Sequence, residues 1–156
     1  MSNPRRNQSG FTLVELLIVV IILGILAAVV IPQFNTAAAE SKEAALASNL
    51  ATIRQAIELY KVQHNDTFPD NAIVTKLTTQ TDATGAAGTK YGPYIRNSFP
   101  SNPLDPNAAT ADDVATPAAM PAAPTAAGGW IYATGTGEFR ANIAGTGPSG
   151  TDYFDL

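Results

Sequence analysis

The sequence predicts an α+β protein in which one long N-terminal α-helix packs on a small antiparallel β-sheet. Three observations lead to this fold class. Residues 11–31 are almost entirely apolar, residues 32–64 are rich in helix formers with a regular apolar stripe, and residues 129–143 alternate as β-strands do. We therefore divide the chain into a leader at residues 1–10, the two helix halves, and a globular head at residues 65–156.

The apolar run at residues 11–31 is long enough to cross a bilayer. A helix rises ~1.5 Å per residue and the hydrocarbon layer is roughly 30 Å thick, so about 20 apolar residues suffice. Arg5 and Arg6 precede the run, and Glu15 is the only charged residue inside it. Because basic residues favour the cytoplasmic side, we expect a single-pass segment that places the rest of the chain across the membrane.

Two plainer interpretations of this run leave Glu15 unexplained. A secretory signal peptide shares the basic start and small residues such as Ala27 and Ala28, but its apolar region is typically about 7–15 residues long. A simple membrane anchor explains the length of the run. It does not explain the carboxylate, because a charge at the centre of a membrane helix costs roughly 2.5–3.5 kcal/mol.

A cut between Gly10 and Phe11 gives Glu15 a partner. The cut frees an α-amine on Phe11, which is cationic below its usual pKa of about 7.7–8.0. Glu15 lies four residues further on, one helical turn away on the same face and near the positive end of the helix dipole. The amine and the carboxylate can then neutralise each other, within one chain or between neighbours, and set the register between helices.

The segment SGFTLVELLIVVIILGILAAVVIP closely resembles the class III leader of type IV pilins and type II secretion pseudopilins. The shared features are a short basic leader and Gly10, Phe11, Thr12, Leu13, Glu15, Gly24 and Pro32. The resemblance implies that a prepilin peptidase cleaves after Gly10 and N-methylates Phe11. It also implies that Glu15 pairs with the Phe11 amine of an adjacent subunit while the helices bundle into the core of a filament.

The resemblance further implies a structural subunit of a type II secretion pseudopilus that drives protein secretion. Such a subunit sits in the inner membrane with its C-terminal domain in the periplasm, and its filament lies in the cell envelope. The implied partners are further copies of the chain, minor pilins or pseudopilins, the peptidase and the inner-membrane assembly platform. The alternative is a type IV pilus subunit for adhesion, motility or DNA uptake. The lack of cysteines favours the pseudopilin, because many type IV pilins carry a paired-cysteine loop.

Composition argues against other classes of protein. The formal net charge is −4, and the basic residues Lys76, Lys90, Arg96 and Arg140 are dispersed, so we expect no nucleic-acid partner. With no cysteine and with His64 as the one histidine, neither a thiolate or histidine-cluster metal site nor a histidine-based triad is expected. No phosphate-binding loop or nucleophile–base set is recognisable, so we expect no enzyme.

Residues 32–64 continue the helix as an amphipathic half. Pro32 predicts a bend or local opening, although we expect the helix to continue through it in the lipid-inserted state. Asn65, Asp66 and Pro69 end the helix. The large apolar residues are spaced by four, three, four and three positions and form one stripe that can dock a small sheet: Leu46, Leu50, Ile53, Ile57 and Tyr60. The other side carries charges that we expect to face solvent: Glu40, Lys42, Glu43, Arg54, Glu58 and Lys61.

The head is predicted to be rich in loops. We expect one short helical turn near residues 72–77, an exposed Ala/Pro/Thr-rich loop at residues 107–129, and an antiparallel hairpin at about residues 129–143 with Trp130 partly buried. Major pseudopilins often bind calcium in a C-terminal loop, so Asp152 and Asp155 are candidate calcium ligands. Solvated tail carboxylates are the alternative, and no other cofactor is expected.

Overall fold

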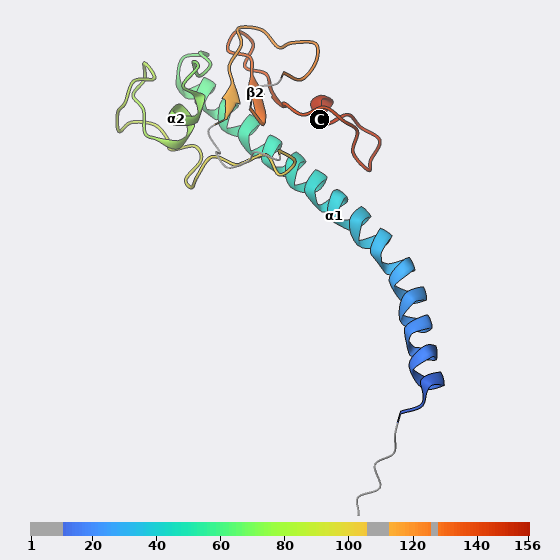
Figure 1. Ribbon diagram of the computed structural model, residues 1–156. Coiled ribbons are helices and arrows are strands. Elements are labelled where there is room, and N and C mark those ends of the chain that lie inside the picture. Colours follow the sequence, from blue (N-terminus) through green and yellow to red (C-terminus); the bar gives the residue numbers. More distant parts are fainter. Residues whose placement is uncertain (1–10, 106–112, 126–127) are drawn as a thin grey trace, which may run out of the picture. The chain divides into compact units, whose positions relative to one another are not determined.

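The computed structural model describes residues 11–105, 113–125 and 128–156 (Figure 1). The elements in chain order are α1 (Leu13–Gln63), α2 (Ile73–Thr78), β1 (Val114–Ala115), β2 (Trp130–Tyr132), β3 (Phe139–Ala141) and the 3₁₀ turn η1 (Tyr153–Asp155). The chain falls into two compact units, one ending at Ala38 and the other running from Ala39 to Leu156. Helix α1 belongs to both units, which we describe separately.

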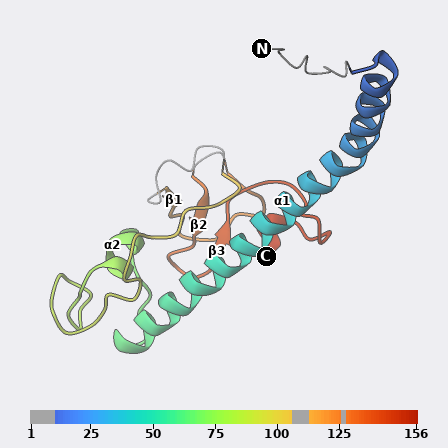
Figure 2. The same ribbon diagram turned by 90° about the horizontal axis from the view of Figure 1, so that it is seen from below.

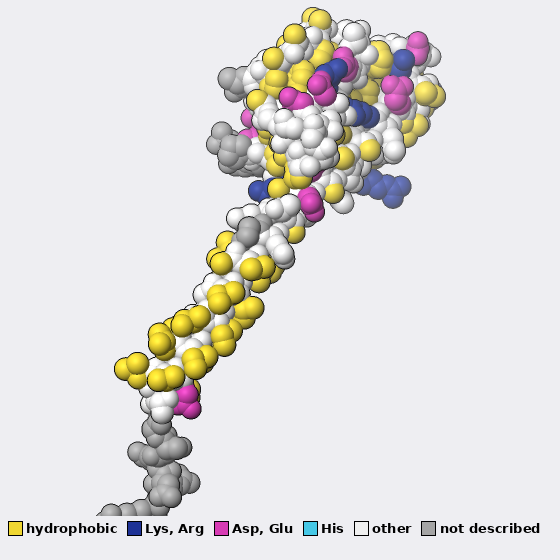
Figure 3. Space-filling model, turned by 90° about the vertical axis from the view of Figure 1, so that its right-hand side faces the viewer, with side chains coloured by type: hydrophobic (Ala, Val, Ile, Leu, Met, Phe, Trp, Pro, Cys, Tyr) yellow, Lys and Arg dark blue, Asp and Glu magenta, His cyan; other side chains and the backbone are white. Residues whose placement is uncertain are grey.

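The first unit contains the apolar half of α1. The helix begins at Leu13 and passes through Pro32 without interruption, so Pro32 does not open it. By length and composition α1 is apolar enough to cross a membrane. Apolar side chains cover the visible face of this segment (Figure 3). The structure therefore confirms that this half is a continuous helix, and its crossing of a membrane stays a prediction.

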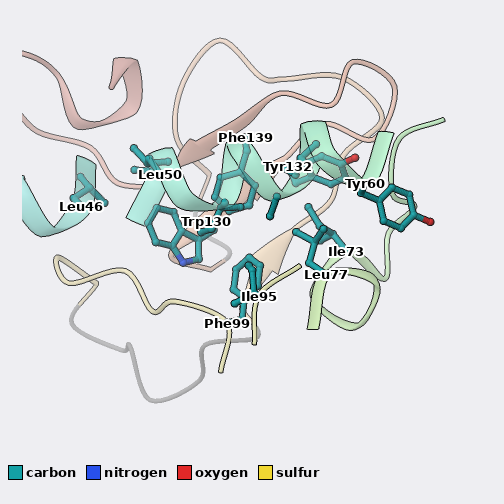
Figure 4. Packing of buried hydrophobic residues seen from close by; sticks show 14 residues of the cluster. Leu46, Leu50, Tyr60, Ile73, Leu77, Ile95, Phe99, Trp130, Tyr132 and Phe139 are labelled. Atoms are coloured by element: carbon teal, nitrogen blue, oxygen red, sulfur yellow. The ribbon is translucent and has the colours of Figure 1, made fainter. Parts of the chain in front are cut away.

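In the second unit, the second half of α1 supplies one wall of the core. The predicted stripe is confirmed, because Leu46, Leu50, Ile53, Ile57 and Tyr60 are all 3% exposed or less. The stripe packs on side chains from α2, the sheet and the intervening loop, which Figure 4 shows at close range: Ile73, Leu77, Ile95, Phe99, Trp130, Tyr132 and Phe139. A helix face and a small sheet thus bury each other's apolar side chains.

The sheet has three strands in the order β1-β2-β3 and lies beside α1 (Figure 2). Strands β2 and β3 form the predicted antiparallel hairpin, with Trp130 opposite Ala141 and Tyr132 opposite Phe139. Strand β1 pairs with β2 in parallel, so the expectation of a purely antiparallel sheet was wrong. All three residues of β2 are buried, because its second face is covered as well, and Trp130 is fully rather than partly buried.

The Ala/Pro/Thr-rich segment is more ordered than predicted where the structure describes it. It contains β1, and residues 114–117 are half-buried. The Asn142 side chain accepts from the Thr125 amide at 2.7 Å and donates to the Gly128 carbonyl at 3.0 Å. The Asn142 side chain, which follows β3, therefore holds this segment in place, although the segment has no apolar periodicity of its own. The remaining residues of the predicted loop lie outside the described residues.

Candidate functional site

The N-terminal turn of α1 holds the Glu15 carboxylate in a capping box. The Thr12 amide and hydroxyl donate to Glu15 Oε2 at 2.8 and 2.7 Å, and the Glu15 amide donates to Thr12 Oγ1 at 3.2 Å. A Thr-x-x-Glu spacing at the start of a helix produces this reciprocal pair, because each side chain satisfies a backbone N–H that has no helical acceptor. Glu15 therefore has a partner within its own chain.

The sequence reasoning missed the role of Thr12, although the Thr12-x-x-Glu15 spacing carries the signal. Phe11 directly precedes the capping box and its side chain is 71% exposed. Gly10 lies outside the described residues. The structure brings Glu15 to Thr12, and the pairing of Glu15 with a freed Phe11 amine stays a prediction about the cleaved chain.

The apolar half of α1 offers no buried side for its large side chains. From Leu13 to Ile31 these side chains are between 42% and 80% exposed, with Val30 and Leu13 at the two limits. A continuous exposed apolar surface of this length requires a lipid environment or contact with other apolar surfaces. Glu15 is the one charged side chain in this stretch.

A charged cluster lies on the head where β3 meets the second half of α1. Arg140 contacts Glu138 Oε1 through Nε at 2.7 Å and through its second terminal nitrogen at 2.6 Å, and it contacts Asp155 Oδ1 at 3.0 Å. Arg54 donates to the carbonyls of Phe139 and Leu156 at 3.0 and 2.8 Å. Burial and, to a lesser extent, the nearby Arg140 charge lower the pKa of Arg54. Arg54 was expected to face solvent, and the structure corrects this expectation.

The two candidate calcium ligands have different protein partners. The Asp152 carboxylate accepts from the Phe154 amide at 3.1 Å and caps the turn η1. The Asp155 carboxylate is paired with Arg140. Among the residues that the structure describes, no group of three or more histidine, cysteine or acidic side chains is placed to hold a metal ion. As placed, the pair does not fit the ligand set that calcium requires, and calcium binding stays a prediction from resemblance.

The one histidine is part of the core. The His64 ring stacks on Tyr60 with their centroids 3.7 Å apart, Nδ1 lies 2.8 Å from the Tyr60 carbonyl, and Nε2 lies 3.0 Å from Thr81 Oγ1. The side chain is 3% exposed. Nδ1 thus contacts the last turn of α1, and Nε2 joins this end of the helix to the chain after α2, which is a structural role.

Comparison with known proteins gives one match to a family model and several matches to known relatives. Residues 5–31 match the model of the prokaryotic N-terminal methylation motif. The chain is 43% identical over 60 residues to type II secretion system core protein G of Pseudomonas aeruginosa, a match that covers 38% of this chain and 42% of the relative. The chain thus spans less than half the length of that relative.

Two further relatives extend the comparison. Core protein G of Klebsiella michiganensis is 30% identical over 107 residues, which cover 64% of this chain and 70% of the relative. Type IV major fimbrial protein FimA of Dichelobacter nodosus is 51% identical over 51 residues, which cover 33% of each chain. No solved structure matches the chain.

Proposed function

The chain belongs to the pilin and pseudopilin family that includes type II secretion system core protein G, and we propose that it is a structural subunit of a type II secretion pseudopilus. The observation that carries this proposal is the match to core protein G over 70% of the Klebsiella relative. The fold supports the proposal, because an exposed apolar helix half continues into a head with its own core. The family is a structural one, and we infer no catalytic role.

The proposed subunit is anchored in the inner membrane by residues 11–31, with the head in the periplasm. Arg5 and Arg6 lie on the N-terminal side of the span, which supports a cytoplasmic N-terminus. The implied partners are further copies of the chain, minor pseudopilins, a prepilin peptidase and an inner-membrane assembly platform. In the assembled filament the apolar surface of the helix would be covered by the same surface of neighbouring subunits.

Maturation at Gly10 supplies the chemistry of assembly in this proposal. In the uncleaved chain Phe11 carries an amide and Thr12 satisfies the Glu15 carboxylate. Cleavage after Gly10 creates a cation at Phe11, and an ion pair in apolar surroundings is far more favourable than an isolated charge. The amine of a neighbouring subunit would then draw the Glu15 carboxylate into an intermolecular pair that fixes the axial register of the two helices.

A type IV pilus subunit is the second candidate function. The 51% identity to FimA of Dichelobacter nodosus favours it, but this similarity is confined to 51 residues. The similarity to core protein G extends over 107 residues and so reaches further along the chain. Loss of extracellular protein secretion in a deletion strain would support the pseudopilus, whereas loss of surface fibres with normal secretion would support the pilus.

Mass spectrometry of the native N-terminus tests the proposed maturation. We expect the mature chain to begin with N-methylated Phe11. A Gly10→Ala variant should accumulate as a longer, unprocessed precursor in the same cells. A Gln8→Ala variant is the matched control within the leader and should be processed normally. Mature protein of normal size from Gly10→Ala would rule out the proposed cleavage site, and an intact leader on functional wild-type protein would rule out the maturation scheme.

A further inference from the structure

The C-terminal segment, residues 145–156, is pinned to the head at several separate points. Its own hydrogen bonds close a tight loop, with the Gly147 amide donating to the Thr151 carbonyl at 2.9 Å and the Tyr153 amide donating to the Gly145 carbonyl at 2.9 Å. The turn η1 then packs against β3. Phe154 is 5% exposed, and Tyr153 and Leu156 pack against the core. Apolar contacts therefore hold the end of the segment, and polar contacts join the rest of it to the head.

Arg140 of β3 provides the central contact. Its guanidinium contacts carboxylate oxygens of Glu138 and Asp155, and it lies 3.4 Å from the carbonyl oxygen of Phe154. The guanidinium carbon also lies 5.1 Å from the centroid of the Phe154 ring. Two carboxylates and a main-chain carbonyl are the oxygen types that bind calcium in proteins. Here a cation that is covalently part of the chain occupies the space between them.

We propose that the Arg140 guanidinium takes the place of a bound calcium ion in this head, so that the C-terminal segment keeps its fold without calcium. The planar guanidinium carries five N–H donors and cannot be deprotonated in a protein, which suits it to a permanent structural charge. Its two contacts with Glu138 fix the plane of the group, and a third contact reaches Asp155 across the strand–turn boundary.

The surrounding charges disfavour a divalent ion at the same place. Arg54 and Arg140 line the same surface pocket together with Asp155. A calcium ion near Asp155 would face two guanidinium groups, and like charges at short range repel strongly where the medium is partly desolvated. Of the two candidate calcium ligands, Asp155 is paired with Arg140, whereas Asp152 contacts neither Arg54 nor Arg140. The Asp152 carboxylate already caps η1.

A second anchor holds the other end of the segment without any cation. The Glu43 carboxylate of α1 accepts from the Ser149 hydroxyl and from the Ser149 amide, the latter at 3.3 Å. A Cβ atom at Gly147 would lie 2.6 Å from this carboxylate, so the loop approaches α1 as closely as a glycine permits. Glu43 is thus used as a hydrogen-bond acceptor for the loop, and the loop needs no ion to reach the helix.

Thermal unfolding of the full chain in detergent micelles tests the proposal. Wild-type protein is measured in EGTA and again in millimolar calcium chloride, with magnesium chloride as the control for ionic strength. We expect the Tm to agree within about 1 °C in all three buffers, since a ligand that binds only the folded state raises the Tm. We expect Arg140→Met to lower the Tm by about 4 °C or more. Arg96→Met, at an exposed arginine, is the matched control and should leave the Tm unchanged.

Hydrogen exchange at residues 145–156 locates the effect, and Arg140→Lys provides a milder variant in case Arg140→Met does not fold. Lysine keeps the charge but loses the planar fork, so we expect faster exchange in this segment and a smaller fall in Tm. A rise of several degrees in the wild-type Tm with calcium alone would overturn the proposal. So would unchanged exchange in both Arg140 variants. Because the readout is unfolding of the head, the result does not depend on whether the subunit serves a pseudopilus or a pilus.

Discussion

Every buried polar side chain in the described part of the head has a hydrogen-bond partner. Tyr132 is a clear case, because it is fully buried in the core and its hydroxyl donates to the Pro69 carbonyl at 2.8 Å. An unpaired polar group inside the core would cost about 1–3 kcal/mol. A head with so small a sheet therefore depends on individual polar contacts to join its loops to its core.

Tyr132 is expected to make the stability of the head fall at alkaline pH. Burial raises the pKa of its hydroxyl well above the ordinary value of about 10. Burial also raises the pKa of Tyr60. Because the folded-state pKa lies above the unfolded one, the stabilisation is fully present below a pH of about 10 and is lost as the pH rises through the folded-state pKa. Tyr132→Phe should reduce this alkaline loss and should lower the free energy of unfolding by about 1 kcal/mol at neutral pH.

Urea unfolding of the full chain between neutral and alkaline pH measures both effects. Tyr153→Phe removes a hydroxyl from a half-buried tyrosine and is the matched control. If the free energy of unfolding falls equally with pH in wild type and in Tyr132→Phe above pH ~10, the alkaline loss does not come from Tyr132.

At the level of single residues, the sequence predicted positions that a repeating pattern determines. Leu46 and Ile53 follow from spacing alone, because one helix face faces the core. Arg54 does not, because its acceptors lie at Phe139 and Leu156, far along the chain. The calcium candidates illustrate the same limit, since only the folded chain places Arg140 beside Asp155.

Among the elements, α1 has two sides with different roles in the head. Leu50 on the stripe is 1% exposed, whereas Leu59 is 49% exposed. We expect Leu50→Ala to lower the free energy of unfolding by about 2–5 kcal/mol, since it removes a transfer contribution and leaves a cavity. Leu59→Ala is the matched control, with the same chemistry in the same helix, and should have an effect below about 1 kcal/mol. Chemical denaturation in micelles gives both values, and equal losses would contradict the assigned docking face.

The sequence predicted the elements that carry their own pattern. The hairpin β2–β3 follows from alternation and glycines in the turn, and α1 follows from composition and period. Strand β1 has two residues, which is too short for a period, and it pairs with Trp130 and Ile131 in parallel across the Ala/Pro/Thr-rich segment. Such a pairing depends on the rest of the fold, so the mixed sheet could not be read from the sequence.

For the whole molecule, the exposed apolar half of α1 and the carboxylate at its start are the features that the head does not explain. The large side chains of the apolar half are exposed. The capping box explains why Glu15 is tolerated in one chain, but a glutamine could form the same box. The capping role therefore leaves the negative charge itself unexplained, and the proposed pairing with a freed Phe11 amine would explain it.

Two substitutions separate the charge of Glu15 from its capping role. Glu15→Leu removes both, whereas Glu15→Gln keeps a side chain that can cap Thr12 and removes only the charge. If the carboxylate pairs with the Phe11 amine of a neighbouring subunit, both variants should insert into the membrane and be cleaved, yet neither should form filaments, because each freed amine would be buried without a counter-charge. Fractionation checks insertion, mass spectrometry checks cleavage, and electron microscopy of sheared filaments checks assembly. Wild-type filament yield from Glu15→Gln would show that the capping role of residue 15, and not its charge, is what the apolar helix requires.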